Sequence, residues 1–181
     1  MGDRAAGEFD RQAISAEMER ARQDFHHLLD HATPADLRRP SDGTKWTNEQ
    51  LLFHMLFGYL IVQALLVLVR IFSRLPDRAS TTFARLLDAA RKPFHLINYA
   101  GSRIGARIIP RARMGKVLDR VIAALRRRVD REDDTGLRTG MHYPTSWDPY
   151  FADYMSRYDL YRYPTQHFDH HRRQLTLHSP D

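Results

Sequence analysis

The chain of 181 residues contains no cysteine. This excludes disulfides, thiolate metal sites and a cysteine nucleophile, so any metal ion must be held by imidazole, carboxylate or water. Lysine is also scarce, so the positive charge behind the net charge of +6 comes almost entirely from arginine. A basic balance of this kind suits nucleic acid, anionic lipid or an acidic small molecule as a partner, and selects none of them.

An apolar segment that could form the core of a signal peptide is missing from residues 1–10, which mix charged and mainly small side chains. We therefore expect a cytoplasmic protein. Strand-period alternation and internal repeats are also missing, which favours an all-α fold. The length predicts a single domain over residues 1–181.

Four segments have apolar residues at three- and four-residue spacing and are predicted as helices. They are residues 8–30, 47–73, 115–130 and 163–177. The second begins at a capping box, in which Thr47 is followed three residues later by Gln50. Pro164 is expected either in the first turn of the fourth helix or at a kink.

Residues 51–69 are almost continuously apolar and long enough to cross a membrane. His54 and Gln63 interrupt this stretch, which favours a buried bundle helix over a membrane span. Residues 76–114 form an insertion between the second and third helices, with a short helix over residues 82–90 and a mixed helical and irregular remainder. We expect this insertion to cover the second helix, and contact with a membrane surface or a second copy of the chain is the alternative.

A segment rich in aromatic residues, 142–163, joins the third and fourth helices. Asp148 followed by Pro149 is typical of a helix start, so a short helix is predicted from there to about Arg157.

Two histidines of the fourth helix, His167 and His171, are four residues apart. This spacing places both imidazoles on one helical face, where they can converge on one ion. His54 lies near the start of a helix that must pack against the fourth, and can supply a third ligand. His27 and His31 on the first helix have the same spacing, however, so spacing by itself leaves the site open.

Two motifs resemble those of the DinB/YfiT-like family. Residues 46–54, WTNEQLLFH, are similar to the family segment in which a tryptophan precedes the second helix and a histidine follows in its first turns. Residues 166–175, QHFDHHRRQL, are similar to its closing motif, HxxHHrxQl or HxxxH. The resemblance implies a four-helix bundle running up-down-down-up, with zinc or nickel held by His54, His167 and His171. The insertion and Pro164 depart from the family pattern and affect the expected shape of the pocket.

The resemblance further implies an enzyme that acts on a small-molecule substrate. Members include transferases and isomerases that use a low-molecular-weight thiol such as mycothiol or bacillithiol, and others described as metal-dependent hydrolases. Asp169, Tyr158, Tyr161 and His170 are candidates for supporting or acid–base roles, with a structural role as the alternative for each.

A non-catalytic, metal-stabilised stress-response or docking protein is the alternative function, in which the apolar helix and the basic insertion bind a partner or a membrane surface. A homodimer is expected if the apolar second helix exceeds what one chain can cover. Nucleic-acid binding ranks last, because the basic residues are dispersed and no recognised binding motif is present.

Overall fold

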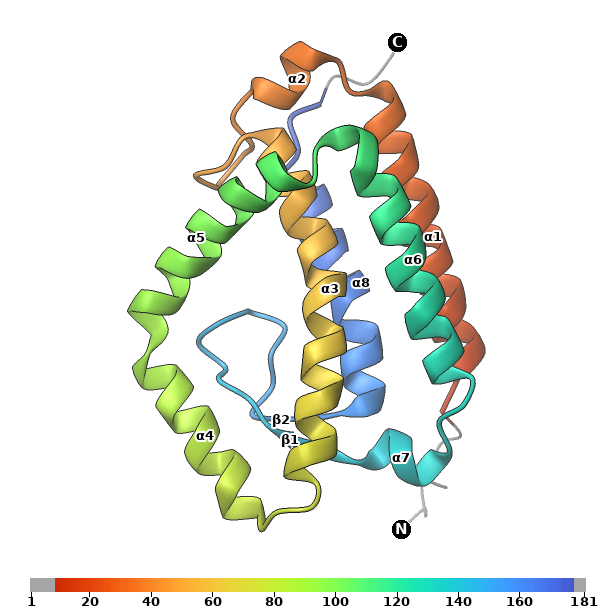
Figure 1. Cartoon of the computed structure of the whole chain (residues 1–181), viewed down its shortest axis with the longest axis vertical. Coiled ribbons are helices and arrows are strands. Elements are labelled where there is room, and N and C mark those ends of the chain that lie inside the picture. The colour runs from red at the N-terminus through yellow and green to blue at the C-terminus, as the bar shows by residue number, and fades with distance from the viewer. Residues whose placement is uncertain (1–8, 178–181) are drawn as a thin grey trace, which may run out of the picture.

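The computed structural model describes residues 9–177 and contains eight helices and one small sheet in that range (Figure 1). The helices are α1 (Arg11–His31), α2 (Pro34–Arg38), α3 (Asn48–Phe72), α4 (Asp77–Ala89), α5 (Arg91–Ile108), α6 (Arg111–Val129), α7 (Asp134–Arg138) and α8 (Arg157–Arg172). The strands are β1 (Gly140–His142) and β2 (Tyr154–Ser156).

Helices α1, α3, α6 and α8 form a four-helix bundle, and the prediction of an all-α fold is confirmed. Figure 1 shows α1 and α8 running in one direction and α3 and α6 in the other, which is the up-down-down-up arrangement. Helix α3 packs against α8 and α6, and α1 packs against the same two helices. The predicted start of the first helix, at Glu8, lies outside the described residues.

The insertion is a helical crossover, because α3 and α6 run in the same direction and the chain must return along the bundle between them (Figure 1). Helix α4 and helix α5 make this return, so the insertion, expected to be partly helical and partly irregular, is almost entirely helical. Helix α5 packs on α3 through Ser102 and Ala106, which are buried. A Cβ atom at Gly105 would collide with the ring of Phe53, so glycine permits this close approach.

The segment before α8 differs most from the sequence-based expectation. The helix predicted from Asp148 to Arg157 is absent from the structure, and β2 pairs antiparallel with β1, Met141 opposite Met155. Helix α8 begins at Arg157, six residues earlier than predicted, because Ser156 and Asp159 form a capping box. The sequence therefore contains a start signal for α8 at Ser156 that the prediction of a helix from residue 163 did not use.

Pro164 consequently lies at the end of the second turn of α8, inside the helix. It has no N–H to donate to the preceding turn, and an interior proline costs an isolated helix about 3 kcal/mol. Pro164 is buried between the buried residues Tyr163 and Thr165. Packing of this stretch against the bundle is therefore what retains the helix across the proline.

Helix α3 is the central element of the core. It is the one described helix long and apolar enough to cross a membrane, and 56% of its most apolar 18-residue window is buried. Its inward residues pack with those of α1, α6 and α8 in one cluster that includes Met18, Leu56 and Leu118. These contacts support the interpretation of α3 as a buried bundle helix.

Candidate metal centre

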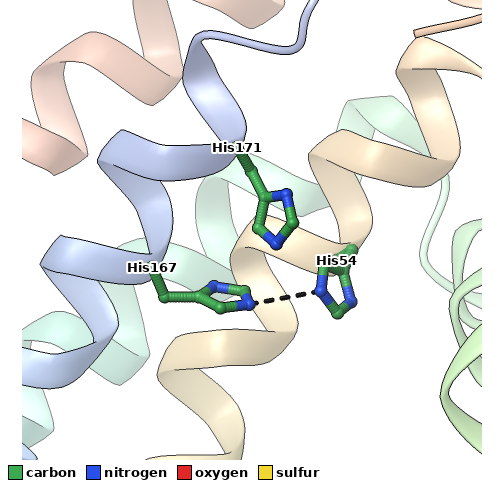
Figure 2. A group of neighbouring side chains, drawn as sticks. All are labelled: His54, His167 and His171. Atoms are coloured by element: carbon green, nitrogen blue, oxygen red, sulfur yellow. Dashed lines mark hydrogen bonds between the residues drawn. The ribbon is translucent and has the colours of Figure 1, made fainter. Parts of the chain in front are cut away.

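Three histidine side chains from two helices meet between α3 and α8. Figure 2 shows the rings of His54, His167 and His171 pointing toward one another. Their ring centroids are 4.5–4.9 Å apart, and one nitrogen atom from each lies within 4.8 Å of those of the other two. The structure therefore brings together all three side chains that the sequence pointed to as ligands.

The close packing of α3 and α8 at this point depends on a glycine. A Cβ atom at Gly58 of α3 would lie 2.7 Å from Nδ1 of His167. Gly58 is one turn after His54, so the same face of α3 presents one of the three histidines and makes room for another. This explains how a histidine from each helix can reach the other without separating the helices.

Hydrogen bonds determine which nitrogen of His54 is available. Its Nδ1 lies 3.1 Å from Oγ of Ser102, and that hydroxyl donates its own proton to the carbonyl of Asn98 at 3.0 Å. The Ser102 oxygen can therefore only accept from His54, which places the ring proton on Nδ1. The lone pair of Nε2 faces the other two histidines, where it can accept a hydrogen bond from Nε2 of His167 or bind an ion.

His171 is oriented in the same way. Its Nδ1 lies 2.6 Å from Oε1 of Gln174, which accepts the ring proton and leaves Nε2 unprotonated. Trp46 covers the cluster from outside, stacked on His54 with ring centroids 4.4 Å apart. Trp46 directly precedes the capping box of α3, and its ring also lies edge-on to that of His171, with 6.4 Å between centroids.

His167 lacks such a partner. Its Nε2 lies 3.2 Å from Nε2 of His54, and its buried Nδ1 has no hydrogen-bond partner within residues 9–177. A buried polar atom without a partner is uncommon and destabilising in a folded protein. With Nε2 directed at two other ring nitrogens, His167 is placed as a ligand and poorly placed as a structural histidine.

The electrostatics keep all three rings neutral near pH 7. Burial lowers the pKa of His54 to about 3, with a smaller contribution from nearby His171. Burial likewise lowers the pKa of His171 to about 4, although the hydrogen bond with Gln174 acts in the opposite direction. The pKa of the buried His167 is also lowered well below its usual value, by burial and by the neighbouring histidines. Neutral imidazoles are the form that binds metal.

These residues fit a divalent metal ion. In a tetrahedral zinc site with Zn–N distances near 2.0–2.1 Å, ligand nitrogens are about 3.3 Å apart, close to the 3.2 Å between Nε2 of His54 and Nε2 of His167. Three neutral nitrogen donors are typical of zinc and nickel sites, and a set of three leaves a position open.

Comparison with known proteins agrees with this geometry. The family model described as the DinB superfamily matches residues 17–175. The chain belongs to the DinB superfamily. Searches of curated proteins and of solved structures found no match. The matched range includes most of α1, all of α3, α6 and α8, and the three histidines of this DinB protein, so the family resemblance proposed from two motifs extends over most of the chain.

A carboxylate lies beside the three histidines of this DinB protein. Oδ2 of Asp148 is 3.7 Å from Nε2 of His167 and accepts a hydrogen bond from the Tyr163 hydroxyl at 3.0 Å. Burial raises the pKa of Asp148, while the N–H of Tyr150 and the Tyr163 hydroxyl act against the rise. Sequence reasoning missed this residue because Asp148-Pro149 was interpreted as a helix start. The loop position of Asp148 becomes visible only once β1 and β2 are paired.

Three of the four supporting residues suggested by the sequence lie away from the cluster. Asp169 forms an ion pair with Arg20 on the surface, Tyr158 packs on Phe9, and Tyr161 donates a hydrogen bond to Glu132. His170 packs edge-on against Tyr150 and also against His171, with 4.9 Å between the two histidine ring centroids, so it is the one of the four that touches the cluster. Ser102, Gln174 and Asp148, which the sequence did not single out, lie beside His54, His171 and His167 respectively.

Proposed function

We propose that this DinB protein is a metal-dependent enzyme whose divalent ion, zinc or nickel, is held by His54, His167 and His171. The observation that carries the proposal is the convergence of three neutral imidazoles, two of them with Nδ1–H committed to a hydrogen-bond acceptor. Residues that serve only to fill a core do not need this arrangement of protons. A small molecule is the expected substrate.

A divalent ion bound here supplies a positive centre that acidifies a bound water or thiol. Ser102 and Gln174 keep the ring protons away from the centre, and Trp46 limits the access of water. The Asp148 carboxylate, with its raised pKa, is placed to accept the proton that the nucleophile loses. A proton on Asp148 can afterwards be returned to a leaving group.

Thiol transfer is the reaction that we favour, with hydrolysis as the second choice. The chain has no cysteine, so a sulfur nucleophile has to arrive with a cosubstrate such as mycothiol or bacillithiol. The proposal rests on family resemblance and on this chemistry. A hydrolase would use water at the same position and the same Asp148 carboxylate.

The test is elemental analysis of the tag-free protein, followed by assays with thiol cosubstrates. We expect about one zinc or nickel per chain, and metal-dependent consumption of a thiol when a suitable electrophile is supplied. Absence of bound metal after incubation with zinc and with nickel would overturn the proposal. Metal binding without thiol consumption, but with ester or amide cleavage, would replace the transferase by a hydrolase.

A docking role is the second candidate and is favoured by a different observation. Helices α4 and α5 expose large apolar side chains, including Leu96, Ile97 and Ile108 at 67–68% exposure, near the arginines Arg103 and Arg107. Mixed apolar and basic surfaces of this kind suit an anionic membrane surface, and an apolar patch also suits a second copy of the chain. Flotation with anionic vesicles and light scattering in solution would separate these two occupants, and negative results in both would eliminate the docking role.

A further inference from the structure

A cavity of about 290 Å³ opens beside the histidine cluster and extends away from it along α3. His54 and His167 line one end. From there, α3 contributes Phe57, Ile61, Leu65 and Leu68 to the cavity wall. These positions recur at three- and four-residue spacing, so one face of α3 forms a continuous apolar floor.

The crossover helices and the loop between β1 and β2 form the opposite walls. Phe83 and Leu87 come from α4, and Phe94 comes from α5. Trp147 of the loop stacks on Phe94 at 3.7 Å between centroids, and its Nε1–H donates to the carbonyl of Leu87 at 2.9 Å. The walls are therefore fixed to one another, so the cavity is a built feature of the fold.

The cavity is long and narrow. From His54 to Leu68 the floor covers fourteen residue steps of α3, which is about 21 Å of helix. A volume of about 290 Å³ spread over several turns leaves room for a chain and little room for a broad ring system. The volume is also at the lower end of the range for small-molecule sites.

Polarity is concentrated at the two ends. Asp148 and the two lining histidines mark the end near the cluster, and His142, which lies near Asp77 and Asp153, marks the other end. The side chains between them are almost all aliphatic or aromatic. A ligand that matches this pattern has one polar head group and an unbranched apolar body.

We propose that the cavity binds an extended aliphatic chain, such as a medium-chain acyl or alkyl group, with its polar head group at the three-histidine cluster. The position of the head group rests on the proposed metal site, whereas the aliphatic body rests on the cavity alone. The crossover formed by α4 and α5 thereby becomes the element that selects substrates by chain length.

The test uses hexanoate, octanoate and decanoate as probes in calorimetric titrations of the zinc-loaded and the metal-free protein, with 1-naphthoate as a broad aromatic probe. Each buried methylene is expected to raise affinity by up to about fourfold, until the cavity is filled. Zinc is expected to tighten all three chains by a similar factor, because it acts on the common carboxylate. Weaker binding of 1-naphthoate than of decanoate is expected from the narrow shape.

A substitution along the cavity floor tests the chain-length limit. Ile61→Trp fills the cavity seven residues, about 10.5 Å of helix, after His54, so decanoate should lose about tenfold in affinity or more while hexanoate is unchanged. Val67→Trp is the matched control, because Val67 is on the same helix, is 47% exposed and is not among the lining residues. Retained hexanoate binding shows that each variant is folded.

The outcomes separate this inference from the proposed function. Equal affinity for all chain lengths, or preferential binding of 1-naphthoate, would overturn the aliphatic cavity even if zinc binds. Zinc binding that leaves carboxylate affinity unchanged would overturn the head-group placement. A protein that binds no zinc but retains the chain-length dependence would overturn the metal site and the head-group placement and support the aliphatic cavity.

Discussion

Two histidine pairs with the same four-residue spacing have opposite environments in this protein. His27 and His31 lie exposed on α1, with ring centroids 4.0 Å apart, and His31 Nδ1 is hydrogen-bonded to the carbonyl of His27 in its own helix. His167 and His171 on α8 are 4.5 Å apart and point at His54 of a neighbouring helix. The spacing places two rings together in both cases, and the neighbouring helix supplies the third ring in only one.

The comparison shows that a pair of histidines becomes a candidate ligand set through what surrounds it. Opposite the pair on α8, Gly58 leaves room for the His167 ring. Hydrogen-bond acceptors orient His171 and the third histidine, His54, and Trp46 stacks on His54. Burial then keeps the rings neutral. The four predictions that follow test these differences, from the largest expected effect to the smallest.

Removal of the ligands should have the largest effect. The double substitution His167→Ala, His171→Ala is expected to weaken zinc affinity by well over a hundredfold, since even loss of a residue that supports a ligand costs 10–100-fold. The double substitution His27→Ala, His31→Ala is the matched control and should retain wild-type affinity. Competition with a chromophoric zinc chelator measures both, and equal losses in the two variants would contradict the assignment.

Acidification should destabilise the metal-free protein strongly. The folded-state pKa values of His54 and His171 lie near 3 and 4, below the usual value of 6.5, so the unfolded chain takes up protons first as the pH falls. Stability present above pH 6.5 is then lost toward pH 4, by about 1.4 kcal/mol per pH unit for each proton taken up on unfolding. Urea unfolding between pH 7 and pH 4 measures this slope.

The same titration in His171→Leu provides a check on the cause. This variant lacks one group with a lowered pKa, so its free energy of unfolding should fall less steeply with decreasing pH than that of the wild type. A slope identical to that of the wild type would show that His171 does not contribute.

The glycine opposite His167 should tolerate no side chain. Gly58→Ala introduces a Cβ atom 2.7 Å from Nδ1 of His167 and is expected to cost about 1–3 kcal/mol of stability, and to weaken zinc binding as the ring is displaced. Gly101→Ala is the control, because a Cβ atom there meets no described atom within 4 Å. That substitution should stabilise helix α5 by about 0.5–1 kcal/mol. Thermal unfolding that changes in the same direction in both variants would contradict the proposed contact.

Loss of the orienting hydrogen bonds should have a smaller effect. Ser102→Ala and Gln174→Ala each leave a ring N–H without its acceptor and should lower zinc affinity by about 10–100-fold. Ser73→Ala at the end of α3 removes a hydroxyl bonded only to a backbone carbonyl of its own helix, and should leave the affinity unchanged. Zinc affinities equal to wild type in the first two variants would show that the rings are oriented by packing alone.

The sequence was sufficient for the bundle helices and the ligand candidates. Apolar periodicity identifies a face of α1 and α6, and the capping box at Thr47 and Gln50 sets the start of α3 within a residue. These signals are local, because the position of a helix is indicated by its capping residues and by apolar residues that recur on one face within a few turns. The predicted start of α8 was six residues too late although Ser156 and Asp159 form the same kind of capping box, because Pro164 was expected in the first turn and lies inside the helix instead.

The tertiary structure decided the environment of each of those residues. That Asp148 lies beside His167, that Ser102 of α5 orients His54, and that the crossover encloses a cavity all depend on contacts between segments far apart in the chain. Sequence periodicity determines which face of a helix is apolar, but not which partner covers it. The sequence by itself therefore determined the four bundle helices apart from the start of α8, the absence of a sulfur ligand and the three candidate histidines. Packing determined that only one of the two identically spaced histidine pairs meets a third histidine.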